Sequence, residues 1–174
     1  RDADTGALVA RGGAPPPPTA PPRSEQEPEA WWGALAGAIA AAGVAEVDAL
    51  AVAAQQHGMV ALGDSGQVLR PAKLWNDTET APDAGWLIKQ LDGPGPWAAA
   101  TGSVPVASFT ITKLSWLHRS EPEHFERLAH VLLPHDWLIY RLTGAMVTDR
   151  GDASGTGYWS PAEGRYRTDL LRIV

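Results

Sequence analysis

The sequence predicts an α/β protein, on three observations from its first 54 residues. Residues 1–12 are expected to form a hairpin or strand pair, because turn-forming residues precede the apolar stretch Leu8–Ala10. A helix is expected to follow, and then Val47–Ala54, a nearly continuous apolar run that is typical of a strand covered on both faces. Strand, helix and strand in this order favour a mixed or parallel sheet.

The predicted helix extends from Ser24 to Gly43. Ser24 and Glu27 have the spacing of a capping box, and a glycine is a natural helix stop. The helix is preceded by residues 14–22 (APPPPTAPP), which are expected to be an exposed polyproline II connector rather than an SH3 ligand. Apolar residues that recur every four positions predict one buried face, made of Trp31, Leu35 and Ile39.

Shorter elements are expected in the rest of the chain. The turn sequence GDSG predicts a hairpin that joins Met59–Leu62 to Val68–Leu69. The remaining expected elements are helices at about 79–91, 110–119, 121–129 and 135–142, a strand at 129–133, and a last strand and helix before residue 174.

Composition excludes several classes of function. The chain has 174 residues, enough for one domain, and 14 basic against 20 acidic residues give a net charge of −6. This acidic balance argues against a nucleic-acid partner. No apolar run is long enough to span a bilayer, so no membrane partner is expected. The absence of cysteine excludes disulfides and thiolate metal sites and fits a cytoplasmic, reducing location.

The first candidate site is Gln56 and His57, directly after the predicted strand Val47–Ala54. In α/β sheets, ligands bind beyond the carboxyl ends of strands. Both side chains can donate and accept hydrogen bonds, which suits a ligand rich in hydroxyl groups. The alternative is a histidine that is merely hydrogen-bonded at a strand end.

The second candidate site is the sequence KLWNDTET. Trp75 offers a flat apolar face, Asn76 an amide and Asp77 a carboxylate, a combination typical of sugar recognition. The alternative is a solvated turn, because Asn-Asp is itself a turn pair.

The third candidate is Asp152, in the glycine-rich sequence TDRGDASGTGYW. No Gly-Lys-Ser/Thr follows these glycines, so a P-loop is not expected. The histidines of the chain are scattered, without a pair at helical spacing beside a glutamate, and no metal site is predicted.

The order of these motifs resembles the amino-terminal domain of the FGGY carbohydrate kinases, most closely the branch that phosphorylates D-xylulose (the xylulokinases). The resemblance covers the chain from about Asp4, and Lys113, Leu114 and Trp116 resemble the core of the first FGGY signature. Ser120 and Gln56 depart from the usual pattern, and Gln56 loosens the sugar preference. The matching segments are EQEPEAWW, QQHGMV, LRPAKLWNDTET, TGSVPVASFTITKLSWL, EPEHFERLAHVLLPHDWLIYRLTG and TDRGDASGTGYW.

The resemblance implies a ribonuclease-H-like (actin-like ATPase) fold. Residues 1–174 would be the sugar-binding, amino-terminal domain, as an incomplete fragment without the second, ATP-binding domain. The intact enzyme would use ATP and Mg²⁺ to phosphorylate a ketopentose, D-xylulose first, and its partners would be the sugar and ATP, with a homodimer as one possible assembly. Alternatives are a kinase acting on ribulose, gluconate or glycerol, or a non-catalytic sugar-binding module.

The resemblance also assigns roles to particular residues. Gln56 and His57 correspond to the substrate-binding pair, Trp75, Asn76 and Asp77 are neighbours of that pocket, and Asp152 lies in a loop closing the same region. No catalytic residue is expected within residues 1–174. The family's phosphate loop would precede this segment and its catalytic aspartate would follow it.

Overall fold

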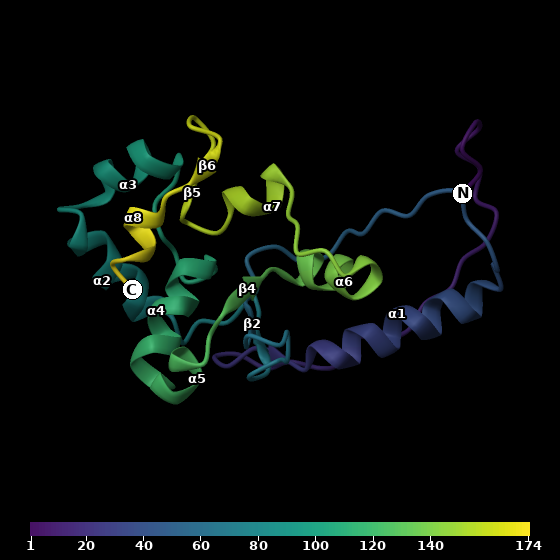
Figure 1. The fold of residues 1–174 in the computed structure, drawn as a ribbon, viewed down its shortest axis with the longest axis horizontal. Helices are drawn as coiled ribbons and strands as arrows, with labels where there is room; N and C mark the ends of the chain where they lie inside the picture. The colour runs from purple at the N-terminus through teal and green to yellow at the C-terminus, as the bar shows by residue number, and fades with distance from the viewer.

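The computed structural model describes all residues from 1 to 174, which form a body and a projecting arm (Figure 1). The body is residues 55–174, and the arm is residues 1–54, which is attached to the body where Glu25–Gln26 pairs with Ala72–Lys73. The elements in chain order are β1 (Glu25–Gln26), α1 (Pro28–Ala42), β2 (Val60–Leu62), β3 (Ala72–Lys73), α2 (Ala81–Gln90), α3 (Pro94–Thr101), α4 (Thr110–Ser120), α5 (Pro122–Glu126), β4 (His130–Leu132), α6 (Pro134–Thr143), α7 (Arg150–Ser154), β5 (Trp159–Ser160), β6 (Arg165–Tyr166) and α8 (Thr168–Leu171).

Helix α1 ends as the sequence predicts but begins differently. Gly43 closes it in the left-handed conformation, with φ of 65°. The N-cap is Glu27, without a side-chain cap hydrogen bond, so the predicted capping box is wrong. Ser24 lies before β1 instead, where its backbone N–H donates to the carboxylate of Asp77.

The predicted buried face of α1 is only partly covered. Trp31 packs edge-on against Trp137 of α6, with ring centroids 6.0 Å apart. Farther along the helix Leu35 is half-buried and Ile39 is 44 % exposed. Figure 1 shows the reason: the second half of α1 extends away from the body.

Two predicted strands of the arm do not form. Val47–Ala54 is extended but unpaired, and Val47 and Leu50 are 68 % and 60 % exposed. Residues 1–12 contain a turn, closed by a hydrogen bond from the backbone N–H of Asp2 to the carbonyl of Ala7, and no strand. A strand needs a neighbour for its backbone hydrogen bonds, and no segment of residues 1–174 pairs with either stretch.

The strand pairs of the structure are all antiparallel. β2 pairs with β4, with Ala61 opposite Val131, β1 pairs with β3, and β5 pairs with β6. The predicted GDSG hairpin is present as an isolated bridge between Leu62 and Val68. The parallel pairing that strand, helix and strand order favours is not formed among these residues.

Strand β2 connects two hydrophobic cores. Successive side chains of a strand point to opposite faces. Ala61 therefore joins the larger core around Leu87, Trp97 and Leu117, whereas Val60 and Leu62 join a smaller core with Trp137. All three β2 residues are fully buried, and this rigid strand begins three residues after His57.

No helix is both long and apolar enough to traverse a bilayer.

Candidate functional site

The backbone of His57 is held in an uncommon conformation. Its φ is +64°, in the left-handed region that residues other than glycine rarely adopt. Such a conformation costs about 1–3 kcal/mol and persists only when the surroundings enforce it. The hydroxyl of Thr110, at the start of α4, donates to the His57 carbonyl at 3.2 Å and is one such constraint.

The imidazole ring of His57 is oriented by two neighbours. Nδ1 lies 2.8 Å from the carbonyl oxygen of Gly155, and the ring stacks on Phe109 with centroids 5.3 Å apart. A carbonyl can only accept a hydrogen bond, so Nδ1 carries the proton and Nε2 of the neutral ring is an acceptor. No protein group donates to Nε2, which leaves it available to a ligand hydroxyl.

Gly155 is required for this contact. A Cβ atom at position 155 would lie 2.0 Å from both Cε1 and Nδ1 of His57, so any side chain would displace the ring. Gly155 directly follows α7, the short helix that carries Asp152. The structure therefore brings His57 next to the segment that contains Asp152, although 95 residues separate them.

Asp152 lies in the first turn of α7 and is 8 % exposed. Its Oδ2 is 3.4 Å from Nδ1 of His135, and its backbone N–H donates to the side chain of Asp149 at 2.9 Å. These contacts fix α7 and therefore the Gly155 carbonyl that orients His57.

Trp75 and Asn76 form a turn directly after β3. A backbone hydrogen bond of 2.8 Å from Met59 to Lys73 ties this strand to the segment that follows His57. Trp75 is 53 % exposed, and Oδ1 of Asn76 is buried without any hydrogen-bond partner. A buried acceptor left unpaired is unusual in a native structure. This oxygen has less than 1 Å² of accessible surface, so a ligand does not reach it in this conformation.

The structure gives Asp77 different surroundings from its neighbours. Its side chain has no exposed surface, and Oδ2 accepts from Nζ of Lys73 and from the Ser24 N–H, both at 2.9 Å. Oδ1 accepts from the N–H of Glu79 at 3.0 Å. Both oxygens are thus used inside the protein, where they hold the Trp75–Asn76 turn, and the carboxylate does not reach a surface that a sugar could touch.

The charge of Lys73 is balanced by three carboxylates. Its Nζ lies 2.7 Å from Glu79 and 3.1 Å from Glu25, in addition to Asp77. The hydrogen bond from Lys73 lowers the pKa of Glu79 below its usual value. Glu25, Asp77 and Glu79 could together hold a cation, and the Lys73 ammonium occupies that position.

Gln56 is exposed on the bend before His57, and its side chain makes no hydrogen bond within the protein. The structure thus joins Gln56, His57, Trp75, Asn76 and Asp152 through contacting segments, and these five residues are called the His57 site below. Sequence reasoning did not identify Phe109 and Gly155. No spacing rule connects residues 57, 109 and 155, which only the fold brings together.

The glycine-rich segment of residues 155–157 does not fit the phosphates of a nucleotide. A phosphate loop leads into a helix N-terminus, whereas Gly155 follows a helix. A Cβ at Gly157 would lie 2.7 Å from Ile111, so this glycine packs against side chains rather than cradling a ligand. His135, Asp149 and Asp152 bring possible metal donors within 4.8 Å of one another, but they are paired among themselves.

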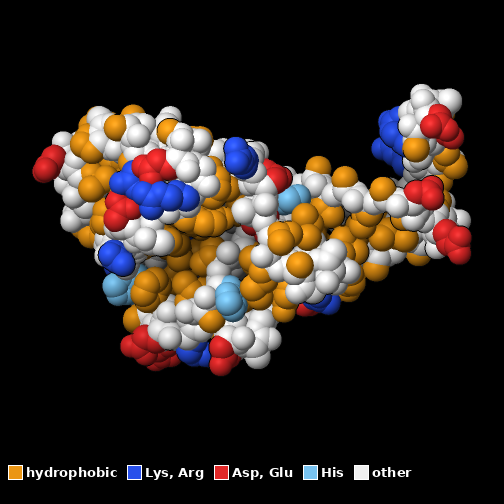
Figure 2. Space-filling model, turned by 45° about the horizontal axis from the view of Figure 1, so that its top comes forward, with side chains coloured by type: hydrophobic (Ala, Val, Ile, Leu, Met, Phe, Trp, Pro, Cys, Tyr) orange, Lys and Arg blue, Asp and Glu red, His pale blue; other side chains and the backbone are white.

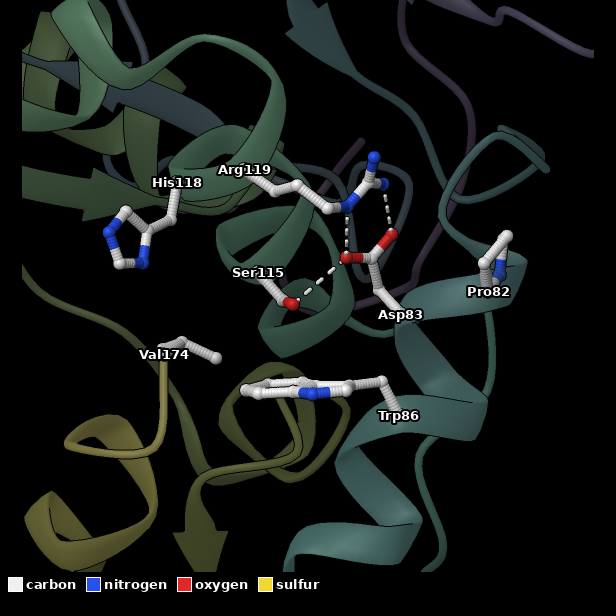
Figure 3. A pocket seen from close by; sticks show the side chains of 7 residues that line it. All are labelled: Pro82, Asp83, Trp86, Ser115, His118, Arg119 and Val174. Carbon is white, nitrogen blue, oxygen red and sulfur yellow. Dashed lines mark hydrogen bonds and ion pairs between the residues drawn. The ribbon is translucent and has the colours of Figure 1, made fainter.

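Two cavities lie away from the His57 site. One, of about 490 Å³, is bounded by Trp86 of α2, His118 of α4 and Val174 (Figure 3). Within it Arg119 forms an ion pair of 2.8 Å with Asp83. The other, of about 670 Å³, is mostly apolar and is lined by Val147 and Tyr166 among others. Figure 2 shows apolar side chains in a central hollow and along the arm.

The comparison with known families defines the class of protein. Residues 14–174 match the N-terminal domain of the FGGY family of carbohydrate kinases. The chain belongs to this family, which confirms the resemblance and the predicted fold class.

Curated relatives are xylulose kinases. The chain is 48 % identical to the xylulose kinase of Streptomyces coelicolor over 175 residues, which cover 99 % of this chain and 36 % of that protein. It is 39 % identical to the xylulose kinase of Escherichia coli over 150 residues, 84 % of this chain and 30 % of the relative. The chain thus spans about a third of the length of the relatives that it matches.

Solved structures of kinases from this family have the same fold as this chain. The xylulose kinase from Bifidobacterium adolescentis superposes with a TM-score of 0.92 and 41 % identity, over 99 % of this chain and 39 % of that one. The glycerol kinase of Plasmodium falciparum superposes with a TM-score of 0.80 at 18 % identity over 91 % of this chain and 34 % of that one, and supports the fold alone.

Proposed function

We propose that this chain is the sugar-binding domain of a kinase that uses ATP and Mg²⁺ to phosphorylate D-xylulose to D-xylulose 5-phosphate. The observation that carries the proposal is His57. Its ring is oriented by Gly155 and Phe109, its backbone is strained, and its Nε2 has no protein partner. Backbone strain of this kind is concentrated at functional sites. The similarity to xylulose kinases points to the sugar.

The other members of the His57 site suit a sugar as well. A sugar hydroxyl can donate to Nε2 of His57 while it accepts from the amide of Gln56. The half-exposed ring of Trp75 offers an apolar face to the C–H groups of a sugar. Asp152 and Asp77 would act indirectly, by fixing α7 and the Trp75–Asn76 turn.

Transfer of the phosphoryl group requires more than this site supplies. Phosphoryl transfer depends on alignment of the attacking oxygen with the γ-phosphate and on charge stabilisation by bound Mg²⁺. Within this chain the residues hold the acceptor sugar so that one hydroxyl keeps a fixed position. We therefore expect residues 1–174 alone to bind sugar without turning it over.

The test is His57→Ala in the complete kinase that carries this domain. A sugar hydroxyl left without its partner costs about 1–3 kcal/mol. This corresponds to a loss of roughly 5- to 150-fold in kcat/KM for D-xylulose. The KM for ATP should change little, because His57 does not contact the nucleotide in this proposal. Steady-state kinetics with each substrate varied in turn measure both effects.

His130→Ala is the matched control, because His130 is an exposed histidine on β4. It should leave both substrates unaffected. Wild-type sugar kinetics in His57→Ala would support a histidine that is only hydrogen-bonded at its position.

A second candidate substrate is gluconate. A gluconate kinase from Lactobacillus acidophilus superposes with a TM-score of 0.80 and 25 % identity, over 91 % of this chain and 33 % of that one. The xylulose kinase from Bifidobacterium adolescentis is closer on both measures, so D-xylulose is the first choice. Phosphorylation rates of the complete kinase with D-xylulose, D-ribulose, gluconate and glycerol would identify the preferred substrate. Sugar binding without phosphorylation of any of these by the complete protein would indicate a non-catalytic module.

A further inference from the structure

Lys113 is a fully buried lysine without a carboxylate partner. Its side chain is 0 % exposed, and no acidic side chain lies within 4 Å of Nζ. Nζ donates instead to three backbone carbonyls, those of Ala107 at 3.2 Å, Ser108 at 2.5 Å and Phe109 at 3.3 Å. An ammonium group has three donors, so its capacity matches these three acceptors.

Two features of this position disfavour a charged lysine. Lys113 lies in the first turn of α4, where the helix dipole is positive and repels a cation. Burial also lowers the pKa of Lys113 to about 7. A methionine or leucine would fill this volume without either penalty. What a lysine provides at this position, and an apolar residue does not, is hydrogen bonds to the carbonyls of residues 107–109.

The segment 107–109 is in direct contact with His57. The ring of Phe109 stacks on the His57 imidazole, and Thr110, the next residue, donates to the His57 carbonyl. The ring and the strained backbone of His57 are thus both supported from one short segment. The side chain of Thr112 also donates to the Phe109 carbonyl at 2.7 Å, as a second tie on it.

We propose that Lys113 is a positioning residue of the sugar site: by binding the carbonyls of residues 107–109 it holds Phe109 and Thr110 against His57. The proposal rests on the proposed function of the His57 site. Lys113 has no exposed surface and does not touch the sugar, so its effect is transmitted through the segment 107–109 and His57.

Lys113→Met tests the proposal, because it removes the donors and keeps the length of the side chain. A contact group displaced by about 1 Å can reduce activity by up to about 100-fold. In the complete kinase we expect a loss of about 10-fold or more in kcat/KM for D-xylulose, mainly through the sugar KM, with an unchanged KM for ATP. Lys113→Arg, which keeps charge and donors, should restore a large part of the loss.

Leu170→Ala is the matched control for lost stability. Leu170 of α8 is 2 % exposed and belongs to the larger core, but it is neither in the His57 site nor in segment 107–109. It should lower the melting temperature at least as much as Lys113→Met does, while the sugar KM of the folded enzyme stays within about 2-fold of wild type.

The outcomes separate this proposal from the proposed function. If the wild-type enzyme binds D-xylulose and Lys113→Met leaves its sugar KM unchanged, or if Leu170→Ala raises it equally, the positioning role is wrong. If the wild type neither binds nor phosphorylates a sugar, the proposed function fails. Should Lys113→Met not fold, Thr112→Val removes the second tie to Phe109 with little change of shape. A selective rise of the sugar KM in that variant would support the role, and wild-type values would overturn it.

Discussion

The arm and the body of this protein are built from similarly apolar sequence, yet only the body has a core. Of the 43 buried residues, the arm contributes Ser24, Gln26 and Pro28. Several of its large apolar side chains remain exposed, with Val9 71 % and Val47 68 % exposed. In the body, each strand is paired with another strand, and the helices pack against neighbouring elements. Apolar composition therefore becomes buried surface only where another element supplies the opposite side.

The largest expected change in stability is found by comparing a buried leucine of the body with an exposed leucine of the arm. Leu62→Ala empties a fully buried position in β2 and should lower the free energy of unfolding by about 2–5 kcal/mol. Leu50→Ala, at a position 60 % exposed, should change it by less than about 0.5 kcal/mol. Urea unfolding of the two variants measures the contrast. Equal losses would show that the arm is covered in solution.

Asp77→Asn breaks the ion pair that holds the Trp75–Asn76 turn. Because Lys73 keeps Glu25 and Glu79 as partners, the loss should lie near the lower end for a buried pair, about 3 kcal/mol. The sugar KM of the folded enzyme should rise only together with this loss of stability, because the enclosed carboxylate acts through the Trp75–Asn76 turn and does not reach the sugar. Asp48→Asn, on the exposed arm, is the control and should be neutral. A rise in the sugar KM without loss of stability would assign Asp77 to the sugar.

Lys113 makes the stability of the body depend on pH. Its pKa is about 7 in the folded protein and 10.5 in the unfolded chain, so the unfolded chain binds more protons between these values. The stability that this lysine contributes therefore increases as pH rises from 7 toward 10 and is lost as pH falls through 7. Relative to Lys113→Met, the wild type should gain about 1 kcal/mol per pH unit from pH 7 to 9. Parallel curves in urea titrations at several pH values would contradict this.

The smallest effect concerns the surface of the arm. Unpaired extended backbone beside exposed apolar side chains promotes association. The 174-residue chain should therefore sediment above its monomer mass of 18.5 kDa as concentration rises. Leu50→Lys should shift it back toward the monomer, whereas Asp48→Lys, in the same stretch, should do so less. A wild-type monomer at every concentration would refute the expectation.

The sequence predicted an element correctly where residues within that element, or directly beside it, determine where it ends. Gly43 and Gly144 end α1 and α6 in the left-handed conformation, as their positions suggest. The predicted strand at 129–133 is β4. Val47–Ala54 has the same kind of apolar run, but pairing depends on a second segment, and none lies beside it.

Helix α3 shows the opposite error, an element that sequence reasoning did not identify. Its first residues, Pro94-Gly-Pro, favour a turn. The helix forms because Trp97 is fully buried and its ring N–H donates to the Leu87 carbonyl at 3.0 Å. Tertiary packing outweighs the local preference for a turn.

By itself the sequence determined the family, the ends of the main helices and the choice of His57 as the central ligand-binding candidate, because these depend on residues close together in the chain. The tertiary structure decided the rest. It turned Asp77 inward to Lys73 and the Ser24 N–H, left Nε2 of His57 free, and placed Phe109 and Gly155 against that histidine. The contacts of His57 with Phe109 and Gly155, and that of Asp77 with Ser24, join segments about 50 to 100 residues apart. No local preference encodes which buried group will meet which partner across such a separation.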